Sequence, residues 1–584
     1  MRRSRASDHR RAPRRVMGLF CAGTLVVLAA DAGDLRSSTP RFYDDDPLLQ
    51  DVDSRDASGV QERTINLIHD YARNLFATPG SREDRRALNI NTIDEVPDSS
   101  WFVNRLLRHD GVPLTGADVA QGPGDGRGPA PGAWTVVSSK REGATPGFVV
   151  LDADGERWFI KFDPADRLEM TTGAEIVGTK LFHAIGYHVP QNAIAFIRRE
   201  DLVVTGESTT IGMSGASRPM RASDVDALLR GIASRADGSY RVLASRALPG
   251  RPVGGFRFHG TRLDDPNDVV PHEHRRELRA LRVFAAWVNH WDSKALNTLD
   301  TIVRDGDREV VRHHLIDFGS TLGSAATRPT DFDAGHMYAV EPRSLLVDAF
   351  TFGFRIRPFE RIRYPDLPAA GRFSADHFDP DLWKPLVPNP AFLRARADDL
   401  FWGARRVMAF TDDMIAAAVA SAQYSDERVS RHITETLIAR RDLIGRAWLT
   451  RVNPLIHPTF DGSVLSFRNA AVDAGVAAPP AGYRAAWFAF DNATDDSTNL
   501  AETRSVGERM PGPDAVSRMT TPWLRVDVAA VAGPEDSWTT PVRLYFRRTA
   551  ERTGWRLVGL ERLPEGPTGA GAGAPAPRPP IASR

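Results

Sequence analysis

The stretch that most constrains the fold of this chain is TLDTIVRDGDREVVRHHLID, residues 298–317. Two strand-like runs flank an Asp-Gly pair, which is the pattern of a β-hairpin with a tight turn. A hairpin folds back on itself, so its two ends lie side by side. We therefore expect Asn297, at the entrance of the hairpin, to lie close to Asp317, at its exit.

A second group of polar residues immediately precedes this hairpin. Residues 289–297 read NHWDSKALN and place His290, Asp292, Lys294 and Asn297 in the order H-x-D-x-K-x-x-N. Lysine is rare in this chain and occurs only at positions 140, 161, 180, 294 and 384, whereas arginine is the common cation. A lysine in such a sequence indicates a place that needs a compact point charge rather than a planar guanidinium group.

Together these groups match the requirements of phosphoryl transfer. One carboxylate accepts the proton of the attacking hydroxyl, a second carboxylate and an amide oxygen hold Mg²⁺ on the phosphates, and an ammonium neutralises charge on the transferred group. Asp292, Asp317, Asn297 and Lys294 would fill these roles in turn. Taken singly, each residue also fits a plainer role, such as a helix cap or a turn, but their combination favours the catalytic interpretation.

This segment resembles the H-R-D-x-K-x-x-N catalytic loop and the D-F-G magnesium motif of the protein-kinase-like fold, with Asp317 opening the second motif. Its setting is more similar to the atypical branch, meaning HipA-like, phosphatidylinositol-kinase-like and CotH-type secreted kinases. The resemblance covers about residues 132–450 and implies an α+β, two-lobed domain with a β-rich N-lobe and a helical C-lobe. It also implies ATP and Mg²⁺ as cofactors, Asp292 as the base, Lys294 at the γ-phosphate, and Asn297 and Asp317 as metal ligands.

The same resemblance assigns nucleotide-binding roles upstream. The strand-like run WFIKF contains Lys161, which matches the kinase lysine that holds the α- and β-phosphates. Strand alternation puts Phe159 on the same face, where it could border the adenine. Glu175, on the helix expected at 171–186 with a threonine start, is the candidate partner of Lys161, and Glu169 is the second choice.

The phosphate-covering loop departs from the kinase pattern. It would be SSKREGATPGF, between two strands, with Lys140, Gly143 and Gly147 close to the phosphates, but it lacks G-x-G-x-x-G. Trp291 stands where H-R-D has arginine, and no clear A-P-E closes the activation segment. Regulation and peptide docking of the ordinary eukaryotic kind are therefore not expected.

The length of 584 residues predicts several domains. Changes in residue pattern along the chain suggest an N-terminal leader with one helix over about 60–76. Strands and then helices follow, and the chain continues with short β-like runs that end in a hairpin at 542–560. Residues 33–57 are polar and acidic and are expected to be mobile. The expected segments are a signal peptide (1–32), an N-terminal leader (33–131), an N-lobe (132–270), a C-lobe (271–459), an all-β accessory domain (460–565) and a disordered tail (566–584).

The first 32 residues predict export. An arginine-rich start, an uncharged run from Val16 to Ala30 and a small-residue site before Gly33 form the three zones of a secretory signal. An uncleaved anchor is the alternative, and it would tether the same domains to a membrane on the same outer side. Cys21, the one cysteine, lies in the apolar run, so a cleaved chain would have no thiol chemistry.

The leading functional interpretation is an exported, ATP- and Mg²⁺-dependent phosphotransferase whose acceptor is a protein, a lipid or a sugar. The alternatives are a nucleotidyl transferase that moves AMP on the same fold, and a non-catalytic binding protein that keeps the kinase fold. The intact Asp292, Asn297 and Asp317 argue against the second alternative. Acidic and basic residues are equal in number, 75 each, so no global field attracts nucleic acid, and nucleic acid is not an expected partner.

Overall fold

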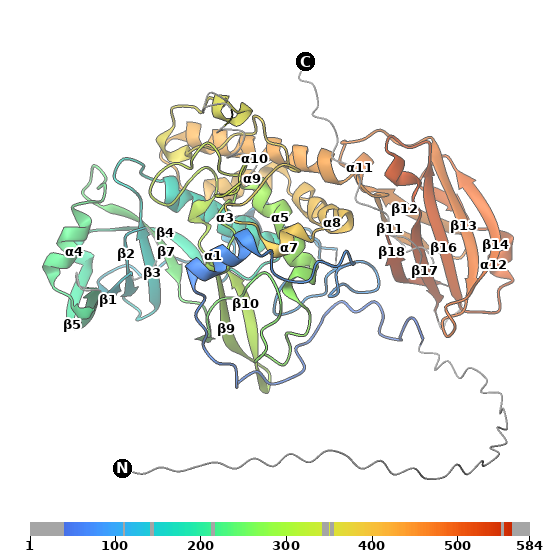
Figure 1. Ribbon diagram of the computed structural model, residues 1–584, viewed down its shortest axis with the longest axis horizontal. Helices are drawn as coiled ribbons and strands as arrows, with labels where there is room; N and C mark the ends of the chain where they lie inside the picture. Colours follow the sequence, from blue (N-terminus) through green and yellow to red (C-terminus); the bar gives the residue numbers. More distant parts are fainter. Residues whose placement is uncertain are drawn as a thin grey trace, which may run out of the picture.

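The computed structural model describes residues 40–108, 111–140, 145–211, 216–341, 350, 356–549 and 554–562. It is a mixed α/β structure with four sheets. Figure 1 shows a large sheet at one end, two further sheets at the other end and most of the helices between them. Within the described residues we find no helix with the length and apolar character needed to span a membrane. The signal peptide and the C-terminal tail expected from the sequence lie outside the described residues.

The large sheet has seven strands in the order β4-β7-β3-β2-β1-β5-β6. Neighbouring strands are antiparallel except β1 and β5, which are parallel. Its apolar side chains form a core of their own, to which the helix α4 contributes Val225 and Leu229. The elements are β1 (Trp134–Ser139), β2 (Gly147–Leu151), β3 (Arg157–Phe162), α3 (Met170–Ile185), β4 (Asn192–Ile197), β5 (Leu202–Ile211), β6 (Ser217–Pro219), α4 (Ala222–Leu229) and β7 (Tyr240–Arg246).

The hairpin expected after Asn297 is confirmed. Strand β9 (Thr298–Asp305) pairs with β10 (Arg308–Leu315) in an antiparallel register that runs from Thr298↔Leu315 to Asp305↔Arg308. Gly306 in the turn has φ 62°, a left-handed conformation that glycine adopts without steric cost. The short strand β8 (Arg251–Pro252) pairs with β9 and completes a three-stranded sheet.

Helices carry much of the largest apolar core. The sequence from 271 to 290 predicts a helix, but the helix is shorter, because a 3₁₀ turn at His272–His274 precedes α5 and Asn289 leaves the helix with φ 51°. The sequence from 393 to 451 predicts long helical stretches, and three helices lie there. The helices are α5 (Arg276–Trp287), α7 (Pro390–Leu393), α8 (Ala397–Met408), α9 (Asp412–Ala420) and α10 (Glu427–Trp448).

The C-terminal region contains a three-stranded sheet, β11-β12-β15, and a five-stranded sheet, β14-β13-β16-β17-β18. Its apolar core is continuous with that of the helices, and Trp538 donates a hydrogen bond to the Thr450 carbonyl at 3.1 Å. The elements are β11 (Leu455–Phe460), β12 (Val464–Asn469), α11 (Ala470–Asp473), β13 (Gly482–Phe490), β14 (Ser497–Ser505), β15 (Arg509–Pro511), α12 (Asp514–Ser517), β16 (Trp523–Val531), β17 (Val542–Arg548) and β18 (Trp555–Glu561).

The N-terminal segment corrects two expectations. Residues 40–57 are not a mobile leader, because Phe42 is buried in the C-terminal sheet against Phe490 and Tyr545. The helix expected from residue 60 begins only at Leu67, since Val60 is buried in a small apolar cluster with Ile302 and neighbours. The helices of this segment are α1 (Leu67–Phe76) and α2 (Gly116–Gln121). In both places, apolar contacts with residues far away in the sequence explain why the structure differs from the expectation.

Candidate active site

Lys161 lies at the centre of an ion cluster built from three separate segments. Its Nζ lies 3.1 Å from Oε2 of Glu175 on α3 and 2.8 Å from Oδ1 of Asp317 after the hairpin. The ion pair expected between Lys161 and Glu175 is therefore present. Glu169, the second choice for that partner, instead accepts hydrogen bonds from the backbone and hydroxyl of Ser425.

The ion cluster depends on how α3 begins. The sequence predicts a threonine start, but the N-cap residue is Glu169, with φ 74° and no side-chain capping hydrogen bond. Asp163, directly after β3, accepts hydrogen bonds from the backbone N–H groups of Thr171 and Thr172 at 3.0 and 2.9 Å. A carboxylate satisfies these N–H groups, which have no partner within the helix. The same contacts fix the strand and the helix that carry the ion pair relative to each other.

Charge is distributed unequally over the cluster. The Lys161 ammonium lowers the pKa of Asp317 to about 2, so this carboxylate stays ionised at neutral pH. Burial raises the pKa of Glu175, whose side chain is 2% exposed. Burial alone would lower the pKa of Lys161, but the two carboxylates raise it. The Asp317 side chain is 45% exposed and offers its charge to a ligand.

Asp317 is held in a left-handed backbone conformation, with φ 63° and ψ 65°. The next residue anchors it: the Phe318 N–H donates to Oε1 of Glu175 at 3.0 Å, and the Phe318 ring packs against Phe182 of α3 with centroids 4.8 Å apart. Gly178 makes this contact possible, because a Cβ there would lie 2.8 Å from the Phe318 side chain. The glutamate that pairs with Lys161 thus also positions the residue after Asp317.

The loop of residues 289–297 is stabilised from within. The Lys294 ammonium lies 2.8 Å from Oδ2 of Asp292, and Nδ2 of Asn297 donates to the Asp292 carbonyl at 2.8 Å. His290 is buried and its ring lies 5.6 Å from that of Phe318, so the loop packs against the residue after Asp317. Burial lowers the pKa of His290, which favours the neutral imidazole.

The two ends of the hairpin lie side by side, as the sequence predicts. The Ile316 N–H donates to the Asn297 carbonyl at 3.0 Å, which joins the two ends of the hairpin one residue before Asp317. The Asn297 amide nitrogen is directed to Asp292, so its oxygen is the group available to a cation. Carboxylate and amide oxygens suit Mg²⁺, which takes one or two protein ligands and completes its shell with phosphates and water. The described residues contain no cluster of three His, Cys, Asp or Glu that could hold a metal ion.

Of the residues expected to cover the phosphates, the structure describes Lys140 and Gly147. Lys140 donates to the Thr145 carbonyl at 3.2 Å, and its charge also lowers the pKa of Asp317. Phe159 shares the strand face of Lys161 and is 43% exposed, so it is open to a flat ligand. Gly147 is explained by strand pairing, since a Cβ would lie 2.0 Å from the Ile160 carbonyl oxygen. Gly143 lies outside the described residues.

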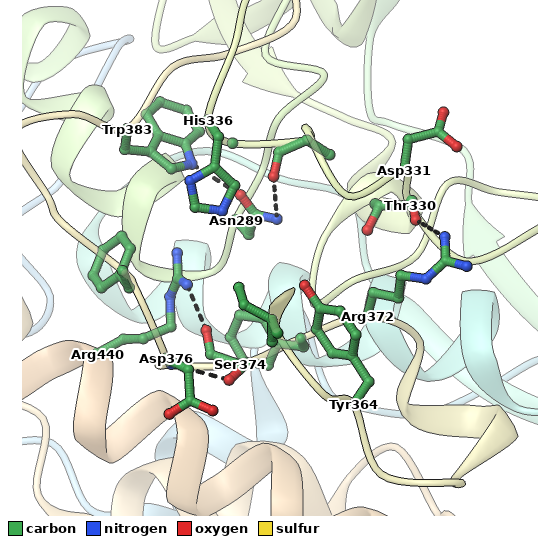
Figure 2. Close-up of a pocket in the computed structure, with 15 residues that line it drawn as sticks. Asn289, Thr330, Asp331, His336, Tyr364, Arg372, Ser374, Asp376, Trp383 and Arg440 are labelled. Carbon is green, nitrogen blue, oxygen red and sulfur yellow. Dashed lines mark hydrogen bonds between the residues drawn. The ribbon is translucent and has the colours of Figure 1, made fainter. Parts of the chain in front are cut away.

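A pocket opens beside the loop of residues 289–297, between Asn289 and Arg440 of α10. Figure 2 shows the Tyr364 hydroxyl pointing into this space, whereas the Asp376 carboxylate points away from it. Arg440 donates to two carbonyls at the end of α5, at 2.8 and 2.5 Å, and burial lowers its pKa to about 9. Sequence reasoning missed this pocket, because no motif links residues so far apart along the chain.

Sequence reasoning also missed the position of Tyr71 of α1, whose ring centre lies 5.8 Å from Nζ of Lys294. The helix itself was expected, but nothing in its sequence indicates that it lies beside the loop of residues 289–297.

No family model matches the chain, and no curated protein sequence matches it. Two solved structures show a distant similarity. The Helicobacter pylori proinflammatory kinase CtkA is 12% identical, and the match covers 52% of this chain and 91% of that chain with a TM-score of 0.27. The golgi casein kinase is 7% identical, and the match covers 55% of this chain and 76% of that chain with a TM-score of 0.25. Neither similarity is strong enough to assign a function to this chain.

Proposed function

We propose that this chain is an exported phosphotransferase of atypical kinase type that uses ATP and Mg²⁺. The observation that carries the proposal is the contact of Lys161 with both Glu175 and Asp317, residues that the sequence separates by 14 and 156 positions. A lysine on a strand, a glutamate on the next helix and an aspartate after a hairpin form one cluster, with Asp292, Lys294 and Asn297 in the loop that begins the same hairpin.

Each group has a role that its surroundings support. Lys161, held by two carboxylates, keeps the charge needed to bind phosphate oxygens. Asp317 and Asn297 would hold Mg²⁺, which neutralises the phosphates when it is bound. Asp292 lies beside Lys294, so that a hydroxyl can lose its proton to the carboxylate while the ammonium faces the transferred phosphoryl group. The acceptor that we propose is a protein, lipid or sugar hydroxyl.

One labelling experiment tests the proposal against its alternatives. The purified chain is incubated with Mg²⁺ and ATP labelled either at the α- or at the γ-phosphate. Transfer of the γ-label supports a phosphotransferase. Transfer of the α-label instead would show that the chain moves AMP, and nucleotide binding without transfer of either label would leave the binding-protein interpretation.

Asp317→Asn should weaken the binding of Mg-ATP by about tenfold or more, since even residues one step behind a metal ligand change metal affinity by about 10- to 100-fold. The change removes the charge that faces Mg²⁺ but keeps the size of the side chain. Calorimetry with Mg-ATP measures the affinity. Asp226→Asn is the matched control, because Asp226 also pairs with one cation and is 47% exposed, close to the 45% of Asp317. Equal affinity of both variants and the unchanged chain would remove Asp317 from the metal site.

Export is a separate part of the proposal and has its own test. In a host that secretes the protein, the exported chain should begin near Gly33, after the small-residue site. N-terminal sequencing reads this directly. Full-length chain recovered with membranes would favour the anchor, and full-length chain recovered only in the cytosol would contradict export.

A further inference from the structure

Arg440 of α10 is a buried cation: it is 5% exposed and, within the described residues, forms no ion pair with a carboxylate. Its guanidinium donates to the carbonyls of Trp287 and Ala286 at the end of α5 and to the Ser374 carbonyl at 2.9 Å. It also lies over the Phe378 ring, 3.5 Å from the ring centre. Carbonyl dipoles and an aromatic face offset only part of the cost of burying a full charge. An anion beside Arg440 would complete the compensation.

The pocket that Arg440 lines also contains two polar groups that are open to a ligand. Figure 2 shows the Tyr364 hydroxyl pointing into the space and the His336 ring beside it, and none of the hydrogen bonds drawn there reaches either group. The His336 ring stacks on Phe359 with centroids 4.6 Å apart, and stacking leaves the nitrogens on the ring edge available. Burial lowers the pKa of His336 to about 4, so the neutral ring keeps one N–H donor.

The two carboxylates in the pocket lining do not neutralise its charge. The Asp376 carboxylate points away from the space in Figure 2. Asp331 forms a bidentate pair with Arg328 at 2.5 and 2.7 Å, and both side chains are 59% exposed. Arg372, a second guanidinium of the lining, donates to the Thr330 carbonyl and adds positive charge. The pocket therefore combines an excess of positive charge with free hydrogen-bond donors.

We propose that this pocket binds a small oxyanion of the phosphate class. The pocket shares no residue with the ion cluster of Lys161, Glu175 and Asp317, so the inference goes beyond the proposed function and does not depend on it. A guanidinium, a phenol and an imidazole N–H are all donors, and they reach the space from three separate segments. A tetrahedral anion presents oxygens in several directions and can use all three donors, whereas a carboxylate presents two oxygens in one plane.

The pocket adjoins the loop of residues 289–297. Asn289, the first residue of that loop, lines the pocket and accepts a hydrogen bond from the Trp383 indole N–H at 2.9 Å. Arg440 in turn holds the two carbonyls at the end of α5, directly before the loop. A ligand that binds the folded state makes local opening less frequent. Bound phosphate should therefore slow hydrogen exchange of the amides around Asn289.

Calorimetry with inorganic phosphate, at constant ionic strength and on the full-length purified chain, tests the inference. We expect saturable binding that is tighter than that of acetate. Tyr364→Phe removes only a hydroxyl and should weaken phosphate binding about tenfold or more, the usual contribution of a hydrogen bond to a charged group. His336→Phe keeps an aromatic ring against Phe359 and should have a similar effect. Tyr338→Phe is the matched control, because Tyr338 is also half-buried in this region but does not line the pocket.

Lys161→Met separates this pocket from the proposed nucleotide site. Phosphate binding that persists in Lys161→Met and weakens in Tyr364→Phe supports the inference. The reverse result would place the phosphate at the ion cluster of Lys161 and overturn it. Acetate binding as tight as that of phosphate, or no saturable phosphate binding to the unchanged chain, would also overturn it. Equal melting temperatures of Tyr364→Phe and the unchanged chain, measured without phosphate, exclude misfolding as the cause of weaker binding.

Discussion

Asp292→Asn should lower the rate of phosphoryl transfer by about a hundredfold to ten-thousandfold, the usual contribution of a general base. The same variant should bind Mg-ATP with nearly unchanged affinity. The reason is geometric: Asp292 contacts Lys294 and Asn297 within the loop, whereas Lys161 and Asp317, the residues proposed to bind the nucleotide, contact each other. The change removes an interaction that matters in the transition state and leaves ground-state binding in place. Calorimetry alongside a transfer assay measures both quantities.

A neighbouring aspartate provides the control for this variant. Asp307 lies at the tip of the hairpin that follows the loop, with a side chain that is 90% exposed, so Asp307→Asn should change neither quantity. If Asp292→Asn transferred phosphate as fast as the unchanged chain, Asp292 would not be the base and the kinase assignment would fail. If binding and turnover fell together, Asp292 would belong to the nucleotide site instead.

Arg276→Met should lower the free energy of unfolding by about 3–5 kcal/mol, the cost of removing one partner from a buried ion pair. Arg276 is fully buried and contacts three carboxylates: Asp94 at 2.7 Å, Asp398 at 2.6 Å and Asp399 at 3.0 Å. These acids come from the N-terminal segment and from α8, so one guanidinium joins both to α5. Methionine keeps much of the volume but leaves three buried negative charges close together. Chemical denaturation measures the loss.

The dependence on pH separates charge from packing in this variant. Burial already raises the pKa of Asp398, and loss of Arg276 should raise it further above the unfolded value. A carboxyl group whose pKa rises on folding stabilises the folded state as the pH falls. The loss of stability should therefore shrink between pH 8 and pH 5. An equal loss at both values would indicate a packing defect. Arg428→Met, at an exposed pair with Asp426, should leave the denaturation midpoint unchanged.

The sequence was most informative where local chemistry decides the structure. The Asp-Gly turn and alternating apolar residues predicted the hairpin, and the hairpin in turn predicted that Asn297 approaches Asp317. The alternation in β3 placed Phe159 and Lys161 on one face. These features depend on neighbours within a few residues, whose preferences are visible in the sequence itself.

Contacts between distant segments could not be predicted in this way. Thr171 looked like a helix cap, but the cap is supplied by Asp163 from outside the helix. Residues 40–57 are polar on average, yet the single aromatic Phe42 finds a buried place in a sheet formed almost 450 residues later. Asp70 of α1 lies 3.7 Å from Arg257, and neither residue belongs to a recognisable motif.

The packing of Phe42 against Tyr545 also has a consequence for synthesis: the N-terminal segment can complete this contact only after Tyr545 has been made. A ribosome makes residue 42 long before strand β18, yet the Leu560 N–H donates to the Thr92 carbonyl at 2.7 Å and the Arg562 side chain lies 3.5 Å from that of Asp94. The first and last described segments therefore complete each other. Until strand β18 has left the ribosome, the early segment lacks these contacts and cannot complete its packing.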